Sequence, residues 1–75
     1  MNLYSVSLSL QGERVIVIYR KPSDIPERID RGLTHLAASV FMDGPNSKVV
    51  YEFSNADSLS KAEEFLKNMN WERDV

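Results

Sequence analysis

Apolar residues follow two different patterns near the start of the chain. In residues 3–10 apolar side chains occupy every even position and serines stand between them. Residues 13–20 instead contain five consecutive apolar residues, mostly β-branched, between Gly12 and Pro22. Alternation predicts a strand with one polar face, and a short β-branched run predicts a strand that is apolar on both faces. Because Gln11 and Gly12 separate the two, we predict a β-hairpin.

The register of this hairpin depends on the length of its loop. A two-residue loop pairs Val6 with Val17, which turns Ile16 toward the serines. A three-residue loop that ends in Gly12 pairs Val6 with Ile16 instead. Both registers leave branched apolar side chains on the serine side. The sequence leaves both registers open, and we expect Val15 and Val17 to face the C-terminal helix.

A short helix is predicted in the connector that follows the hairpin. Asp24 is a typical N-cap residue, Glu27 stands three positions later, and Pro26 suits a first turn. We expect the helix over residues 25–31, closed by Gly32. Its apolar stripe consists of Ile25, Ile29 and Leu33.

A second hairpin is predicted from residues 34–42 and 48–54, because residues 43–47 are a dense run of turn-forming types. A four-residue loop pairs Asp43 with Lys48 and sorts the side chains cleanly. One face is then apolar and holds Ala38, Val40, Met42, Val49, Tyr51 and Phe53. The other face holds His35, Ala37, Ser39, Lys48, Glu52 and one apolar pair, Phe41 opposite Val50.

The last element predicted is an amphipathic helix of about twelve residues. It begins after residues 55–58, whose polar members Asn55, Asp57 and Ser58 are able to cap it. Its apolar stripe consists of Leu59, Ala62, Phe65, Leu66 and Met69. Trp71 follows, and we expect it to fold back on the end of the helix.

We therefore predict an α+β domain: a four-stranded antiparallel β-meander of two hairpins, with the C-terminal helix packed on one face and a short helix between the hairpins. The predicted core consists of Tyr4, Val6, Leu8, Val15, Val17, Leu36, Ala38, Val40, Tyr51, Phe53, Leu59, Leu66 and Met69. The second face would hold Ile16, Ile18, Phe41 and Val50, edged by Arg14, Arg20, His35, Lys48 and Glu52. An apolar surface within a polar rim is typical of protein-binding or dimer interfaces. Alternatively, the stripe of the connector helix closes this face.

Composition is typical of a single small globular domain. A chain of 75 residues is expected to form one domain, residues 1–75, which buries only about 60% of its unfolded surface. The sequence is 43% hydrophobic and 27% charged, as in ordinary globular proteins, and its lack of cysteine excludes disulfides and thiolate metal ligands. No signal-peptide pattern and no run of about 20 apolar residues is present. We expect a soluble, cytoplasmic protein with no membrane partner.

Charge argues against nucleic-acid binding, because the formal net charge is −2 and phosphate binding is usually marked by excess Lys and Arg. A nucleic-acid-binding domain is nevertheless the alternative function. Its phosphate contacts would come from Arg14, Arg20, Lys21, Arg28 and Arg31. A sheet aromatic such as Phe41 would then stack on a base.

Catalytic patterns are weak in this sequence. His35 is the only histidine, there is no cysteine, and no serine stands in a nucleophile elbow. We therefore expect a non-catalytic protein without cofactor or metal. The predicted function is that of a small interaction or regulatory protein, an adaptor, subunit or inhibitor, which binds another protein or a second copy of itself through the second sheet face. The interface candidates are Ile16, Ile18, Phe41, Val50, Arg14, Arg20 and His35.

Overall fold

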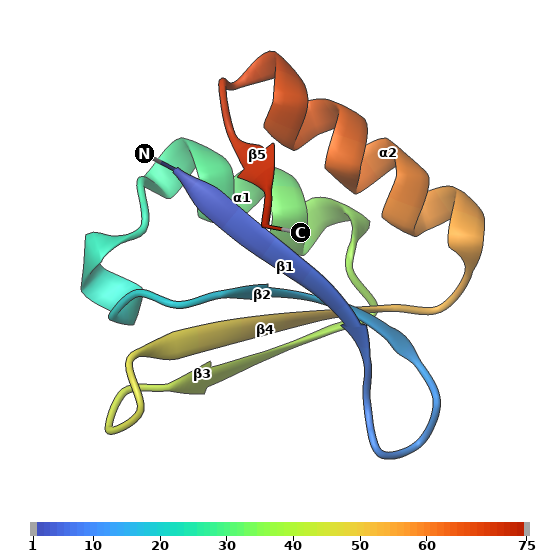
Figure 1. The fold of residues 1–75 in the computed structure, drawn as a ribbon, viewed down its shortest axis with the longest axis horizontal. Coiled ribbons are helices and arrows are strands. Elements are labelled where there is room, and N and C mark those ends of the chain that lie inside the picture. Colours follow the sequence, from blue (N-terminus) through green and yellow to red (C-terminus); the bar gives the residue numbers. More distant parts are fainter. Residues whose placement is uncertain (1, 75) are drawn as a thin grey trace.

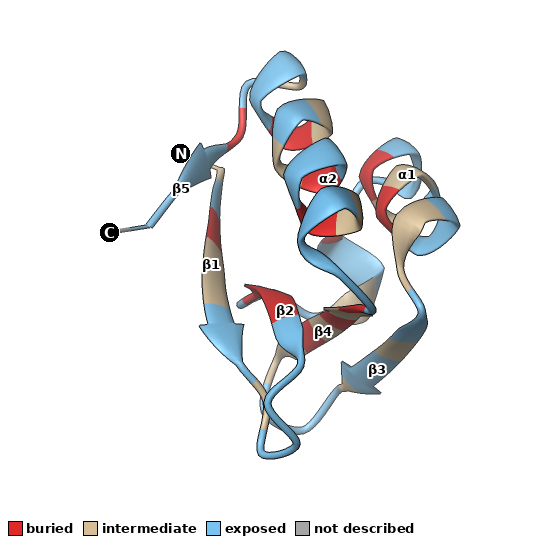
Figure 2. Ribbon diagram, turned by 90° about the vertical axis from the view of Figure 1, so that its right-hand side faces the viewer, coloured by how far each residue is buried: buried red, intermediate tan, exposed pale blue. Residues whose placement is uncertain are grey.

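A five-stranded sheet with both helices on one side makes up the fold (Figures 1 and 2), as seen in a computed structural model that describes residues 2–74. The elements in chain order are β1 (Leu3–Leu8), β2 (Arg14–Ile18), a 3-10 helix (Pro22–Asp24), α1 (Glu27–Leu36), β3 (Ser39–Asp43), β4 (Lys48–Phe53), α2 (Ala56–Asn68) and β5 (Glu72–Arg73). The predicted α+β class, the two hairpins, the helix between them and the C-terminal helix are confirmed.

The strand order is β3-β4-β2-β1-β5, which differs from the predicted meander in two ways. First, β2 pairs with β4 and not with β3. This order places the two strands with the most branched and aromatic residues at the centre, where both faces lose water, and leaves β3 with its polar ends at the edge. Second, β5 adds a short parallel strand beside β1, with the Glu72 N–H donating to the Asn2 carbonyl at 2.9 Å.

The first hairpin adopts the register with the three-residue loop, in which Val6 pairs with Ile16. The Ser9 N–H donates to the Glu13 carbonyl at 2.8 Å, and Gly12 closes the loop at a φ of 81°, a conformation that glycine adopts without strain. Of the two registers, this is the one with Gly12 at the end of the loop, so the expectation that Val15 and Val17 face the C-terminal helix is wrong. Because a shift of one residue exchanges the faces of a strand, Ile16 and Ile18 point toward the helices.

The second hairpin has the predicted register, with Asp43 opposite Lys48, Met42 opposite Val49 and Val40 opposite Tyr51. The C-terminal helix is also confirmed, over 13 residues. Its cap is Asn55, whose side chain accepts a hydrogen bond from the Ser58 N–H at 2.8 Å.

The core lies between the sheet and the two helices. Of the predicted core residues, Tyr4, Tyr51, Phe53, Leu59 and Leu66 are buried in it, and Val6, Leu36, Val40 and Met69 are partly buried against it. Val15 and Val17 are buried, but on the other side of the sheet, because of the register shift. Leu8 and Ala38 are exposed. The core gains Ile16, Ile18, Ile25, Ile29, Leu33, Val49, Ala62 and Trp71.

Helix α1 lies beside α2 on the same face of the sheet, so its stripe does not close the second face as the alternative expected. The helix is also longer than predicted, because Gly32 does not end it. Instead Gly32 is where the Phe65 ring of α2 approaches, since a Cβ there would lie 2.6 Å from Cε2 of Phe65. Asp24 lies in the 3-10 helix and Pro26 occupies the N-cap position of α1. His35 consequently belongs to α1 and not to a strand.

Two buried tyrosines attach the helices to the sheet. The Tyr51 hydroxyl of β4 donates to Oδ1 of Asp30 on α1 at 2.7 Å, and the Tyr4 hydroxyl of β1 donates to Oε1 of Glu63 on α2 at 3.0 Å. Burial, followed by the hydrogen bond to Glu63, raises the pKa of Tyr4 to about 12. Burial and the bond to Asp30 raise the pKa of Tyr51 in the same way. Each tyrosine thus stays neutral and serves as a hydrogen-bond donor.

Trp71 folds back on the end of α2, as predicted, and is 3% exposed. The guanidinium of Arg20 lies 5.0 Å from the centre of its ring, within the range of a cation–π contact. Arg20 also donates from Nη2 to Oδ1 of Asn2 at 2.5 Å. These contacts hold the C-terminal segment beside β1.

Candidate binding surfaces

In the part of the chain that the structure describes, one face of the sheet carries no helix, and we refer to it as the open face. Residues that pair directly across strands share a face, so its members follow from the register. They are Leu3, Ser5 and Ser7 from β1, Val15 and Val17 from β2, Val50 and Glu52 from β4, and Ser39 and Phe41 from β3. Across its middle run Phe41, Val50, Val17 and Ser5 in neighbouring strands.

The exposure of this strip increases toward its ends. Val17 is 7% exposed at the centre of the sheet, Val50 is half-buried, and Phe41 at the edge is 57% exposed. Tyr19, directly after β2, is 67% exposed and lines a hollow of about 230 Å³ with Leu3 and Ser5. The open face therefore presents two large aromatic side chains to solvent, on either side of a buried valine.

Acidic groups border one side of the open face. Glu13 and Glu52 lie close enough that a hydrogen bond between them, followed by burial and the charge of Glu52, raises the pKa of Glu13. Two neighbouring carboxylates favour either a shared proton or a nearby cation. At the opposite border Asp43 pairs across the hairpin with Lys48, and its carboxylate accepts hydrogen bonds from the N–H and Nδ2 of Asn46 at 3.2 and 2.8 Å. These bonds lower the pKa of Asp43.

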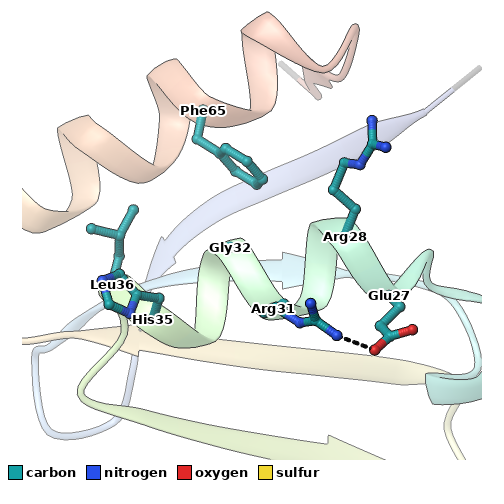
Figure 3. Close-up of a pocket in the computed structure, with 7 residues that line it drawn as sticks. All are labelled: Glu27, Arg28, Arg31, Gly32, His35, Leu36 and Phe65. Carbon is teal, nitrogen blue, oxygen red and sulfur yellow. Dashed lines mark hydrogen bonds and ion pairs between the residues drawn. The ribbon is translucent and has the colours of Figure 1, made fainter.

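A second candidate is the groove of about 640 Å³ between the helices, shown in Figure 3. It is lined by Glu27, Arg28, Arg31, Gly32, His35, Leu36 and Phe65. The Phe65 ring points from α2 toward Gly32, and Phe65 and Leu36 are half-buried against the core. Arg31 forms an ion pair with Glu27 one turn away, so part of the positive charge is already neutralised. The apolar surface of this groove thus belongs largely to helix packing.

The structure brings together only two of the predicted interface residues, Phe41 and Val50, which pair directly on the open face. Ile16 and Ile18 are wrong as interface candidates, because both are 0% exposed beneath the helices. Arg14 is exposed at the start of β2 but pairs with Leu8 and Phe53, on the helix side.

The remaining two candidates also lie away from the open face. Arg20 is engaged by Asn2 and Trp71, and His35 lines the groove between the helices. Of the predicted rim, Lys48 and Glu52 do border the open face. Two of the seven predicted interface residues therefore lie on the open face, and its role as a binding surface stays a prediction.

The five basic residues considered for nucleic-acid binding do not form one surface. Arg14 is the first residue of β2 and Arg20 lies beyond its other end, whereas Arg28 and Arg31 line the groove on the other side of the sheet from Phe41. The charged residues of β3 and β4 on the same face as Phe41 and Val50 are Asp43, Lys48 and Glu52. No array of cations therefore surrounds the aromatic side chain that was expected to stack on a base.

Sequence reasoning missed Val17 and Tyr19 on the open face. The signal for Val17 was present, because the three-residue loop ending in Gly12 predicts its place. The signal for Tyr19 was its position directly after Ile18. Successive side chains of a strand point to opposite faces, so Tyr19 lies on the face opposite Ile18.

Within residues 2–74 no three His, Cys, Asp or Glu side chains gather in an arrangement suited to a metal ion. Neither helix of this part of the chain has the length and hydrophobicity needed to cross a membrane. Comparison of the chain with protein-family models, with curated proteins and with solved structures gives no match.

Proposed function

We propose that the protein is a non-catalytic interaction module, an adaptor, subunit or inhibitor, that binds another protein through the open face. The observation that carries this proposal is the strip of Phe41, Val50 and Val17, which no helix covers, together with the exposed ring of Tyr19. Exposed aromatic side chains around a dry apolar centre, bordered by polar groups, are typical of protein interfaces.

The open face also indicates the chemistry of its partner. Apolar side chains of the partner would cover Phe41 and Val50, and the serine hydroxyls of β1 would supply hydrogen bonds at the rim. A Lys or Arg of the partner beside Glu13 and Glu52 would neutralise the two neighbouring carboxylates. The groove between the helices is the weaker candidate, because its aromatic ring already packs on Gly32.

The test uses the full chain as bait in extracts of its source cells, with two matched variants. Tyr19→Asp places a charge on the open face, and Leu10→Asp makes a comparable change in the loop of the first hairpin, where Leu10 is fully exposed. Proteins retained by the wild type and by Leu10→Asp but lost with Tyr19→Asp support the proposal. Circular dichroism establishes that both variants are folded.

A captured protein is then purified and titrated into the isotopically labelled chain. Amide shifts in the NMR spectrum should concentrate on the central strands and on the residues around Tyr19 and Phe41. Shifts confined to α1 and α2 would assign the binding to the groove and contradict the proposal. Equal capture by all three baits would do the same.

A further inference from the structure

The two edges of the sheet differ in how they are protected. At one edge the short strand β5, with exposed Glu72 and Arg73, covers the first residues of β1. At the other edge, within residues 2–74, β3 pairs only with β4, so one side of its backbone has no strand beside it. Proteins usually protect such an edge with Lys, Pro, a bulge or extreme shortness, and Ser39–Asp43 contains neither Lys nor Pro.

The side chains of β3 expose apolar surface along this edge. Phe41 on the open face is 57% exposed, and Met42 on the helix side is 55% exposed. An unpaired strand edge with exposed apolar residues on both faces is a template for another strand.

We infer that β3 is a self-association edge, at which a second copy of this chain adds its own β3 in antiparallel orientation and extends the sheet. The inference concerns the backbone edge of β3, which adjoins the open face at Phe41, and it does not rest on the proposed function.

The sequence of β3 favours a second copy as the occupant, because the strand is complementary to itself. With Phe41 opposite Phe41 of the second copy, Val40 faces Met42 and Ser39 faces Asp43. Apolar residues then meet apolar residues on both faces, and the two Asp43 carboxylates lie at opposite ends of the ladder. Shifting the register by two residues toward the C-terminus would instead place Asp43 opposite Phe41. A five-residue edge makes a small interface, below about 1,200 Å² in total, so the association is weak and depends on protein concentration.

The first measurement is the mass of the full chain by sedimentation equilibrium over a series of concentrations. The wild type should rise from the monomer mass of 8.6 kDa toward twice that value. Met42→Lys places a charge on the β3 edge and should remain monomeric. Leu8→Lys, at the exposed end of β1, makes a comparable change at the other edge and should dimerise like the wild type. A wild type that stays monomeric, or loss of dimer in Leu8→Lys alone, overturns the inference.

The second measurement tests the register by disulfide formation, since the chain has no cysteine of its own. Directly opposite residues have Cα atoms about 4.5–5.5 Å apart, within the reach of a disulfide, whereas diagonal neighbours are about 7–8 Å apart. Phe41→Cys should therefore cross-link at least about tenfold faster than Met42→Cys, whose equivalent in the second copy is diagonal. Leu10→Cys reports the rate of random collision.

Equal cross-linking rates for the three cysteine variants would exclude the antiparallel β3 pair. The two proposals are also separable from each other. Tyr19→Asp lies outside β3 and should leave the dimer intact while it removes partner binding. Met42→Lys lies outside the open face and should do the reverse.

Discussion

The two faces of the sheet are built from the same central strand and are covered in different ways. On the helix face, Ile16 and Ile18 are 0% exposed beneath α1 and α2. On the open face, Val15 and Val17 are only 3% and 7% exposed although no helix lies above them. Their cross-strand neighbours on this face are Ser7 and Glu52 for Val15, and Ser5 and Val50 for Val17.

This difference shows that low exposure alone does not locate a core. A residue at the centre of a sheet loses water to its in-sheet neighbours even when a face has no second layer. The edges of both faces are exposed, at Phe41 and Tyr19 on the open face and at Met42 on the helix face. What distinguishes the helix face is its second layer, to which the hydroxyls of Tyr4 and Tyr51 donate hydrogen bonds.

The largest difference in stability is expected between replacements of two neighbouring residues that lie on opposite faces. Ile18→Asp puts a carboxylate at a position with 0% exposure and should cost more than about 4 kcal/mol, a large part of the stability of a small domain. Tyr19→Asp should cost less than about 1 kcal/mol, because its side chain is mostly in water. Urea denaturation followed by circular dichroism measures both. Similar losses in the two variants would show that the open face is packed as tightly as the core.

A smaller difference in stability is expected between valine replacements in the two central strands. Val49→Ala and Val17→Ala each remove two methyl groups, a transfer loss of about 1.6 kcal/mol for a fully buried side chain. Only Val49 leaves a cavity enclosed between sheet and helices, so its replacement should cost about 2.5 kcal/mol, whereas that of Val17 should cost only the transfer loss of about 1.5 kcal/mol. The free energy of unfolding is measured in protein dilute enough to stay monomeric. Equal losses of stability in the two variants would mean that a second layer of protein covers the open face in solution.

Tyrosine hydroxyls provide a third comparison. Tyr51→Phe removes the hydrogen bond to Asp30 and should cost about 1–2 kcal/mol, whereas Tyr19→Phe should change stability by less than about 0.5 kcal/mol. The same contacts predict a dependence on alkaline pH. The pKa of Tyr4 is raised from 10.0 to about 12 and that of Tyr51 is raised as well, so the unfolded chain releases these protons first. Stability is fully present below pH 10.0 and falls as the pH rises above it.

Denaturation at a series of alkaline pH values checks this dependence. The loss of stability above pH 10.0 should become shallower in Tyr51→Phe and in Tyr4→Phe, and should be unchanged in Tyr19→Phe. An identical loss in all four proteins would show that the buried hydroxyls do not carry the effect.

The smallest expected effect concerns the acidic border of the open face. The hydrogen bond to Glu52 raises the pKa of Glu13, so the folded state holds this proton more tightly than the unfolded chain and loses a little stability as the pH rises above the ordinary value of 4.5. Glu52→Gln should remove that loss and return the Glu13 pKa toward 4.5. NMR titration of the Glu13 carboxyl carbon measures the change. An unchanged titration curve would show that the two side chains are independent in solution.

Much of the candidate surface was accessible from the sequence, but not all of it. Phe41 and Val50 were assigned to the correct face because the second hairpin has a clear difference between its two faces. Ile16 and Ile18 were assigned to the wrong face because their strand is apolar on both sides, so either register buries branched residues. The groove went unseen, because it depends on how α1 and α2 lie against each other.

The sequence by itself determined the local elements: two hairpins, the amphipathic α2, and the register of the hairpin between residues 39 and 53. Alternation, turn residues and helical spacing act over a few positions, so a single chain segment displays them. Only the tertiary structure decided the rest. The length of the first loop, the pairing of β2 with β4, the continuation of α1 through Gly32 beneath Phe65, and the strand β5 all depend on contacts between distant segments. Those contacts also determine which face of the sheet stays open.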